Sequence, residues 1–472
     1  MLFNSLPFLV LFLPVVALGN AALRRFVGAR GAQLWLLAAS LFFYALPRPA
    51  HLPLLLASIV FNWAVTRLLV APQAGGRQDE RRRKVAFWIG LAANLAFLSS
   101  FKYVNFFLAQ INAVTGAHIS SPSWDFPLGI SFFTLTQVMY LVDCYQEVNA
   151  PISLLDHASV VSFFPYVSSG PIVRAKAIAD QFRAPQAGTA SGGLFLFALG
   201  LTKKVVFADT FSTIANAGFA GGAHLSSVEA WAFSLAYTFQ IYFDFSGYSD
   251  MAVGVGAMLG FDIPQNFNAP YRSRSISEFW QRWHISLSHF ITNYLYTPIL
   301  RSFRKATLRT SAFATLLAMA IAGLWHGPGW TFIVFGLIHG AALAVNQVWK
   351  KSKRKLPRGV DWLLTFLVVN AAFVVFRSPN LAAGAKFLAT MMPHGNILGT
   401  DLLSTVIPMT PTILIRPVVI GIVLAFFFKS SAQLAESFSP TVRRSLATAA
   451  LLVVGLFFVN SSAAKQFVYF AF

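Results

Sequence analysis

The chain has 472 residues, of which 56% are hydrophobic, 11% are charged and 48 are phenylalanine. This composition is that of a protein that crosses a membrane many times, and it excludes an ordinary soluble domain. The formal net charge of +20 does not indicate nucleic-acid binding, because Lys and Arg lie in short clusters between apolar runs, as the positive-inside rule expects.

The apolar runs predict about eleven or twelve transmembrane helices, since a helix needs about 20 apolar residues to cross the bilayer. The first run, residues 1–20, is followed by Arg24, Arg25 and Arg30. This asymmetry predicts a retained first span with its N-terminus outside the cytoplasm, in preference to a cleaved signal peptide. Further runs lie near residues 32–47, 52–71, 85–108, 126–147, 192–215, 226–243, 246–261, 310–325, 329–349, 360–376, 411–428 and 445–461.

Two segments, residues 156–182 and 262–300, are too polar for ordinary membrane spans. We expect them to lie in the interface or to re-enter the membrane. Irregular backbone at membrane depth is tolerated only where protein or a water-filled cavity surrounds it, so both segments should line a cavity. The sequence shows no internal repeat and leaves little room for a soluble domain, so we expect one integral membrane domain over residues 1–472.

His326 lies between two long apolar runs, residues 310–325 and 329–349. Basic clusters at 301–309 and 350–358 flank the outer ends of this hairpin, so both ends should be cytoplasmic. The first run, roughly 24 Å long as a helix, then places His326 between the middle of the membrane and its outer face. An ionisable ring there costs free energy unless it faces a cavity or a partner, and its ordinary pKa of about 6.5 suits proton transfer. We interpret His326 as a reactive group, with a structural role as the alternative.

A second histidine, His284, lies in an aromatic and charged stretch, residues 277–288. This pattern is typical of an interfacial helix that leads inward. A structural hydrogen bond or a contact with lipid headgroups explains this histidine equally well.

Other polar residues in apolar surroundings also need an explanation. Asp244 and Asp250 lie in an apolar segment, so each should need a cationic or hydrogen-bonding partner. Asn266 and Asn268 precede the His284 stretch. Their amides could orient a polar substrate or satisfy backbone groups.

Several standard chemistries are excluded, because the sequence contains no GxSxG elbow, no HExxH motif and no P-loop. His284 and His289 are five residues apart without a suitable carboxylate nearby, and His326 and His339 are thirteen apart, so neither pair has helical metal-ligand spacing. The single cysteine, Cys144, excludes an intrachain disulfide. We therefore expect no bound metal.

The two histidine segments, Arg282-Trp283-His284 and Trp325-His326-Gly327, resemble the hallmark pair of the membrane-bound O-acyltransferases. The likeness covers most of the chain in order, with a family core at about residues 120–380. Within the family the chain is most similar to the bacterial alginate O-acetylase type, which includes transferases that acetylate cellulose or peptidoglycan. It is less similar to the teichoic-acid D-alanylation proteins. Further matching segments are residues 127–133, 170–174, 200–204, 242–251, 266–272 and 376–377.

This resemblance implies an all-α fold around a central tunnel, with acetyl-CoA as the acyl donor and no bound cofactor. The acetyl group would pass from the cytoplasm across a bacterial inner membrane to a polysaccharide, of the alginate type in preference to cellulose or peptidoglycan. His326 would be the catalytic base, and His284 would assist it or line the donor entrance. Relatives of this type work with separate extracytoplasmic esterase-like proteins, so we expect a partner of that kind.

The resemblance also suggests two sets of binding residues. The candidates for the tunnel wall are Trp283, Trp325, Asn266, Asn268 and Asp244. The candidates for charge-assisted hydrogen bonds to the CoA phosphates are Arg272, Arg274, Arg282, Arg301, Arg304 and Lys305. The same basic residues could instead serve only to fix the topology.

Two alternatives are kept. A transporter or flippase of a polysaccharide precursor would also use many helices, broken polar segments and buried ionisable residues, but it leaves the Trp-His-Gly hairpin unexplained. The other alternative is an acyltransferase that moves a long acyl chain to a lipid or protein.

Overall fold

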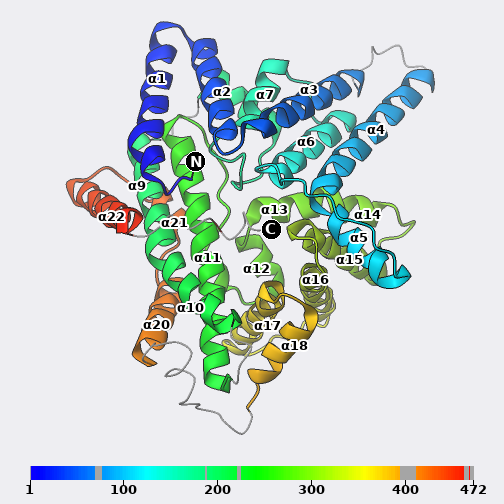
Figure 1. Ribbon diagram of the computed structural model, residues 1–472, viewed down its shortest axis with the longest axis vertical. Coiled ribbons are helices and arrows are strands. Elements are labelled where there is room, and N and C mark those ends of the chain that lie inside the picture. The colour runs from blue at the N-terminus through cyan, green and yellow to red at the C-terminus, as the bar shows by residue number, and fades with distance from the viewer. Residues whose placement is uncertain are drawn as a thin grey trace. The chain divides into compact units, whose positions relative to one another are not determined.

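The computed structural model describes residues 2–69, 77–185, 189–220, 225–393, 411–461 and 467. Within these residues every regular element is a helix (Figure 1). Seven of the described helices are long and apolar enough to cross a membrane, and three shorter ones are also apolar. The seven are Pro7–Phe26, Pro49–Leu69, Asp79–Lys102, Leu308–His326, Trp330–Lys351, Val360–Arg377 and Val442–Val459. The predicted class, an all-α protein that crosses the membrane several times, is confirmed.

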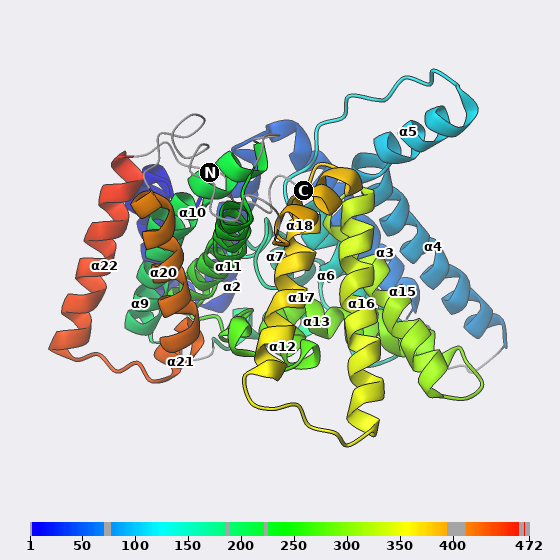
Figure 2. The same cartoon turned by 90° about the horizontal axis from the view of Figure 1, so that it is seen from below.

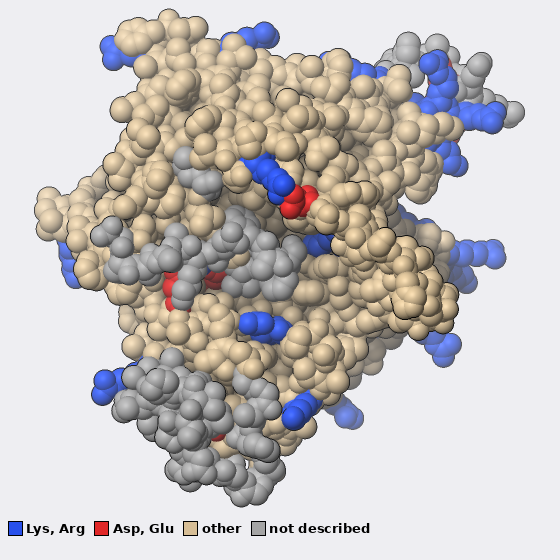
Figure 3. Space-filling view, viewed as in Figure 1, with Lys and Arg blue, Asp and Glu red and all other residues tan. Residues whose placement is uncertain are grey.

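The surface agrees with this class. On the face drawn in Figure 3, uncharged residues cover most of the surface, and more Lys and Arg than Asp and Glu are visible. Many large apolar side chains are exposed on the candidate spans, among them Leu18, Val60 and Phe457. Side chains of this kind are favourable where lipid surrounds the protein.

The chain divides into two compact units, and the first consists of Met1–Phe197 and Met251–Pro264. Its core is aromatic: the rings of Phe3 and Phe8 lie 4.7 Å apart, and those of Phe43 and Phe164 lie 5.7 Å apart. Its helices are α1 (Leu13–Phe26), α2 (Ala29–Ala45), α3 (Leu52–Leu69), α4 (Arg77–Lys102), α5 (Val104–Thr115), α6 (Ile130–Tyr145), α7 (Leu154–Ser162) and α8 (Ala175–Arg183), with the turns η1 (Pro7–Phe12) and η2 (Pro49–His51).

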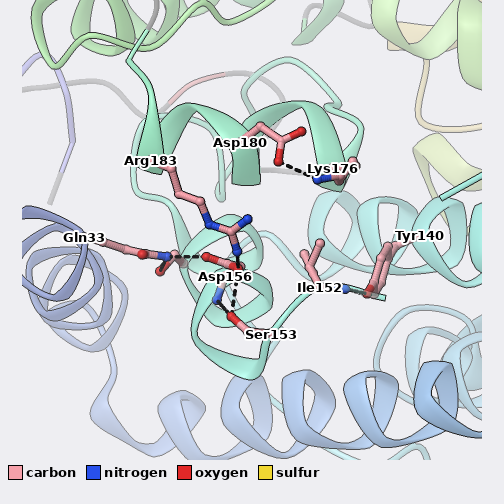
Figure 4. Close-up of polar contacts among 9 residues, drawn as sticks. Gln33, Tyr140, Ile152, Ser153, Asp156, Lys176, Asp180 and Arg183 are labelled. Carbon is pink, nitrogen blue, oxygen red and sulfur yellow. Dashed lines mark hydrogen bonds and ion pairs between the residues drawn. The ribbon is translucent and has the colours of Figure 1, made fainter. Parts of the chain in front are cut away.

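The polar segment 156–182 belongs to this first unit, where Asp156 organises it (Figure 4). The Asp156 carboxylate accepts hydrogen bonds from Gln33 Nε2 at 2.9 Å and from Ser153 Oγ at 2.8 Å, and it forms an ion pair with Arg183. Burial acts to raise the pKa of Asp156, but the hydrogen bonds from Gln33 and Ser153 and the charge of Arg183 outweigh it, so the pKa lies below its usual range. The carboxylate is therefore held ionised.

Between α7 and α8 the backbone of residues 163–173 is irregular and buried throughout. This meets the condition that irregular backbone be surrounded by protein. Gly129, at the start of α6, approaches this loop so closely that a Cβ at its position would lie 2.1 Å from the carbonyl oxygen of Val167. Its φ of 67° also favours glycine. Segment 127–133, which carried the family resemblance, is thus in contact with this buried loop.

The second unit consists of Ala198–Asp250 and Gln265–Phe472. The helices α9 (Ala190–Thr202) and α11 (Ser227–Met258) cross the boundary between the units. The other helices are α10 (Asp209–Ala220), α12 (Ile276–Arg282), α13 (Ile285–Phe290), α14 (Thr297–Arg301), α15 (Leu308–His326), α16 (Trp330–Lys351), α17 (Val360–Arg377), α18 (Leu381–Thr390), α20 (Pro411–Phe427), α21 (Ser431–Glu436) and α22 (Val442–Ser461), with the turns η3 (Lys203–Ala208), η4 (Pro270–Arg272) and η5 (Ile291–Tyr296).

The two apolar runs near 226–243 and 246–261 form one helix, α11, which has 32 residues. Asp244, the polar residue that separates the runs in the sequence, does not break the helix. It is buried and paired with Lys204, so its cost is offset by a contact from another helical segment.

The hairpin of α15 and α16 agrees with the predicted runs and packs tightly. α15 starts with a capping box formed by Thr307 and Thr310. A Cβ at Gly336 would lie 2.1 Å from the carbonyl oxygen of Met319, and one at Gly323 would lie 2.3 Å from that of Phe332. Small residues therefore allow the two backbones to touch, as is common between membrane helices.

The second polar segment, residues 262–300, has irregular backbone and the short helices η4 and α12 in its first half, and then one continuous helical stretch in which α13, η5 and α14 follow without a break. This stretch is not among the described helices that are long and apolar enough to cross a membrane. This agrees with the expectation that the segment is not an ordinary span. Its position at the interface or within the membrane stays a prediction.

Candidate active site

His326 is the last residue of α15 and is buried, with 5% of its surface exposed. The chain after it, Gly327-Pro328-Gly329, cannot continue the helix, so the ring sits where the backbone turns toward α16. Three aromatic rings surround it, with centroids at 5.1 Å for Trp325, 5.9 Å for Phe335 and 5.6 Å for Phe376. The imidazole thus packs against three aromatic rings at the end of the predicted hairpin.

His284 lies between α12 and α13 and is fully buried. Its φ of 43° and ψ of 56° place it in the left-handed region, which is rare for residues other than glycine. Burial lowers the pKa of His284, which lies outside the candidate membrane-spanning helices, to about 3. The ring is therefore neutral at physiological pH.

Asn266 holds the backbone around His284. Its carbonyl oxygen accepts a hydrogen bond from Ile285 N at 3.0 Å, and its side-chain Oδ1 accepts from Ser286 N at 3.1 Å and Ser286 Oγ at 2.7 Å. Two roles were expected for this amide, to orient a polar substrate or to satisfy backbone groups. The structure shows the second, because the amide oxygen accepts from a backbone N–H. Backbone strain of this kind persists only where the surroundings enforce it, and it clusters at functional sites.

Trp325 connects the two predicted histidines. Its ring centroid lies 6.5 Å from that of His284 and 5.1 Å from that of His326. The two motifs, which are separated by 42 positions in the sequence, therefore meet at one indole within the second unit.

Two other predicted tunnel residues are part of the packing beside His284. Trp283 is buried among aromatic rings, with Phe267 at 5.0 Å and Phe373 at 5.2 Å. Asn268 accepts a hydrogen bond from Ser430 Oγ at 2.9 Å, and its backbone N–H donates to Arg282. Their assignment to a tunnel wall stays a prediction.

The two buried carboxylates of α11 have the cationic partners that the sequence led us to expect. Lys204 Nζ lies 2.6 Å from Asp244 and 3.0 Å from Asp209. Lys203 Nζ lies 2.7 Å from Asp250. The lysines belong to segment 200–204, whose family likeness was recognised in the sequence although its pairing was not.

The six basic residues proposed for CoA do not form one cluster. Arg274 pairs with Asp361 at 2.6 Å, Arg282 pairs with Glu278 at 2.8 Å, and Arg272 donates to the carbonyl oxygen of Phe428. The other three are exposed around and after the end of α14: Arg301, Arg304 and Lys305. The six residues thus form three sets. Arg272 and Arg274 make up the first, the exposed Arg301, Arg304 and Lys305 make up the second, and Arg282 is paired with Glu278 of its own helix.

His339 is a buried histidine that we considered in the sequence only as a possible metal ligand. Its Nδ1 accepts a hydrogen bond from Trp280 Nε1 at 3.3 Å, and its ring lies 4.7 Å from Phe335, which in turn contacts His326. The described residues hold no cluster of three or more His, Cys, Asp or Glu side chains that could bind a metal ion. No sequence signal could have found this contact, because Trp280 lies 59 residues away.

Trp280 also lines a cavity of about 330 Å³ between the His284 segment and the hairpin of α15 and α16. The cavity is lined by the middle of α15 and by the second half of α16, whose end is expected to be cytoplasmic. A row of aromatic rings, those of Trp280, His339 and Phe335, connects its wall with His326. The polar residues in the cavity wall include Ser277, Gln281, Ser288, His289, Thr315 and Gln347.

A comparison with known protein families shows which family the chain belongs to. The model of the membrane-bound O-acyltransferase family matches residues 48–378. The chain belongs to this family. The resemblance seen in the sequence is confirmed, and the protein is an acyltransferase. Membership in this family argues against a transporter.

Three relatives within the comparisons carry more specific names. A peptidoglycan O-acetyltransferase of Helicobacter pylori is 36% identical over 523 aligned residues, which cover 100% of this chain and 98% of that one. A protein of Azotobacter vinelandii named probable alginate O-acetylase AlgI is 38% identical over 410 residues, 85% of this chain and 80% of its own. A teichoic acid D-alanyltransferase of Streptococcus thermophilus is 29% identical over 282 residues, 53% of this chain and 68% of its own.

Proposed function

We propose that this membrane-bound O-acyltransferase moves an acetyl group from cytoplasmic acetyl-CoA to a polysaccharide on the outer side of a bacterial inner membrane. The observation that carries the proposal is the meeting of His284 and His326 at Trp325. The names of two relatives, which are 36% and 38% identical to the chain, support an acetyl group and a polysaccharide acceptor.

In this proposal His326 is the catalytic base. Its imidazole takes the proton of an acceptor hydroxyl while that oxygen attacks the thioester carbonyl. The tetrahedral intermediate collapses, the C–S bond breaks, and the imidazolium returns the proton to the CoA thiolate. General base catalysis of this kind typically contributes about 10² to 10⁴ in rate. The apolar rings around His326 would keep water from competing with the acceptor.

His284 fits a supporting role better than the role of base. A ring whose burial lowers the pKa to about 3 is a weak base at neutral pH. Its left-handed backbone and its contact with Trp325 instead suit a residue that positions the indole next to His326. We therefore assign His284 as a positioning residue.

The cavity that Trp280 lines is the proposed entrance for the donor. Its polar wall residues can bind the amides of the pantetheine arm. From Thr315 in the wall to His326 is about 16 Å along α15. Arg301, Arg304 and Lys305 follow closely after Tyr296, which also lines the cavity. We assign the CoA phosphates to these three cations, through charge-assisted hydrogen bonds.

The acceptor is proposed as a polysaccharide of the alginate or peptidoglycan kind, since relatives with either name match most of the chain. An extracytoplasmic esterase-like protein is proposed as the partner: its hydroxyl would accept the acetyl group at His326, and it would then complete the transfer to the polysaccharide. The reason to propose this partner is the family resemblance of the two histidine segments.

Donor and acceptor can be tested together. Purified protein in nanodiscs would receive acetyl-CoA labelled in the acetyl group, an extract of extracytoplasmic proteins, and either alginate or peptidoglycan. We expect labelled acetyl ester on one polymer and no effect of excess palmitoyl-CoA. Strong inhibition by palmitoyl-CoA with label on lipid or protein would replace the proposal with long-chain acyl transfer. Polysaccharide movement without thioester cleavage would return the transporter alternative.

A further inference from the structure

A second hollow of the second unit has no place in the acetyl-transfer chemistry. It is a groove of about 690 Å³ formed by α17, α20, the start of α11 and the loop before α17, and we name it the Arg358 groove. Figure 2 shows the loop that joins the end of α16 to the start of α17 and carries Arg358. Except for three arginines, every residue that lines it is apolar, among them Trp231, Trp362, Leu363, Phe366, Phe426 and Phe427.

The three arginines, Arg272, Arg274 and Arg358, gather at one end of the groove. Arg272 donates to the carbonyl oxygen of Phe428, directly after α20, and Arg274 pairs with Asp361 in the first turn of α17. The end of α20 and the start of α17 both contact η4, since Arg272 bonds to Phe428 and Trp362 Nε1 donates to the neighbouring Tyr271 O, so the arginines mark the same end of the groove.

This end keeps a net positive charge. Asp361 is engaged by Arg274, and the nearby Glu278 is engaged by Arg282 and by the backbone N–H of Arg274. Arg272 Nε is buried and has no hydrogen-bond partner among the described residues. A ligand with an anionic group would compensate for these cations.

The rest of the groove suits hydrocarbon. Trp362 and Phe366 stack along one face of α17, and both contact Phe426 of α20, with ring centroids at 5.3 and 5.4 Å. Leu363 and Phe427 are 46% and 77% exposed, so the wall is open toward the surroundings of the protein. The three arginines match the charged headgroup of a phospholipid, and the exposed apolar walls next to them match its acyl chain.

The walls fit a nucleotide poorly. The two polar atoms among the aromatic side chains are already used, because Trp231 Nε1 donates to Met391 O and Trp362 Nε1 donates to Tyr271 O. An adenine base would find no free hydrogen-bonding group in this wall. This distinguishes the groove from the polar cavity that we assign to the CoA donor.

We propose that the Arg358 groove binds an anionic phospholipid. Its phosphate is held by Arg358 and Arg272 at the cytoplasmic level expected for the 350–358 cluster, and an acyl chain lies between α17 and α20. Tyr271, next to Arg272, contacts Phe366 and also Trp283, which precedes His284. The bound lipid therefore stabilises the segment that carries His284.

The test is lipid binding to the purified full chain by native mass spectrometry, with phosphatidylglycerol and phosphatidylcholine of identical acyl chains. We expect selective retention of phosphatidylglycerol by the wild type. Arg358→Glu should weaken it about fivefold or more, because each basic residue near a lipid phosphate contributes about that factor. Arg354→Glu is the matched control, since Arg354 is an exposed cation of the same loop that does not line the groove.

The apolar half is tested with Leu363→Trp, which fills the groove, and with Leu364→Trp, a neighbour that is 48% exposed and outside it. Only the first should reduce binding. Equal binding of both lipids, or equal effects within either pair of variants, would overturn the proposal. Displacement of phosphatidylglycerol by CoA would assign the groove to the donor and overturn it as well. None of these readouts requires acetyl transfer, so failure here is separate from failure of the proposed function.

Discussion

At the scale of single residues, the candidate site depends on a histidine in an unfavourable backbone conformation. The sequence identified His284 and His326 through the Arg-Trp-His and Trp-His-Gly motifs. It could not identify the strain at His284 or the clamp by Asn266, because both depend on contacts through space between residues 18 to 20 positions apart. The role of Asn266 became visible only once its hydrogen bonds were known.

Asn266→Ala should destabilise the protein by about 1–3 kcal/mol, because it removes the side-chain oxygen that accepts hydrogen bonds from the buried N–H and hydroxyl of Ser286. Acetyl transfer should fall with it. The check is thermal unfolding in detergent, with Asn105→Ala as a control at an exposed amide. If both variants unfold like the wild type, the clamp does not hold His284.

The buried His284 should give the protein a specific pH dependence. Its pKa is about 3 when folded and about 6.5 when unfolded, so the unfolded state binds the proton more strongly between these values. The stabilisation is complete above about pH 6.5 and declines as the pH falls toward 3, by at most about 1.4 kcal/mol per pH unit. Unfolding of the wild type should therefore depend more steeply on pH in this window than that of His284→Gln. Parallel curves would show that burial does not lower the pKa of His284 in the folded protein.

At the scale of helices, the sequence predicted the hairpin around His326 well but divided α11 in two. Hydropathy falls around Asp244, and a local pattern cannot register that a lysine 40 residues earlier neutralises this carboxylate. The same limit applies to α15 and α16, whose apolar runs were clear while their close approach through Gly323 and Gly336 was not.

The buried pair of Lys203 and Asp250 should be strongly coupled. Lys203→Met leaves Asp250 buried without its cation and should cost about 3–5 kcal/mol. Adding Asp250→Leu removes the unpaired charge and should recover most of this loss. Thermal unfolding measures both, and Lys176→Met at an exposed ion pair should change stability by less than about 1 kcal/mol. A double variant as unstable as the single one would contradict the pairing.

The contact between α15 and α16 should tolerate no Cβ at Gly336. Gly336→Ala would place it 2.1 Å from Met319 O, push the helices apart and displace His326, so stability and acetyl transfer should both fall. A change from Gly to Ala in a helix without such a clash normally stabilises by about 0.4–1 kcal/mol, which makes a loss diagnostic. Gly329→Ala is the control, because its Cβ would meet only ordinary contacts at 3.4 Å or more. Equal unfolding temperatures for the two variants would argue against close packing.

At the scale of the whole molecule, composition and charge clusters predicted a helical protein with many membrane crossings, and family membership confirms an acyltransferase. The number of crossings and the course of a tunnel depend on how helices pack, which hydropathy does not encode. The proposed function therefore depends on acetyl transfer at His326.

The most direct test compares acetyl transfer from labelled acetyl-CoA by the wild type and by His326→Ala in nanodiscs with acceptor and partner extract. His118→Ala, at an exposed histidine, is the control, and near-ultraviolet circular dichroism confirms folding. We expect His326→Ala to lose about 10² to 10⁴ in turnover, while His118→Ala keeps wild-type turnover. Wild-type turnover in folded His326→Ala would contradict the catalytic role of His326.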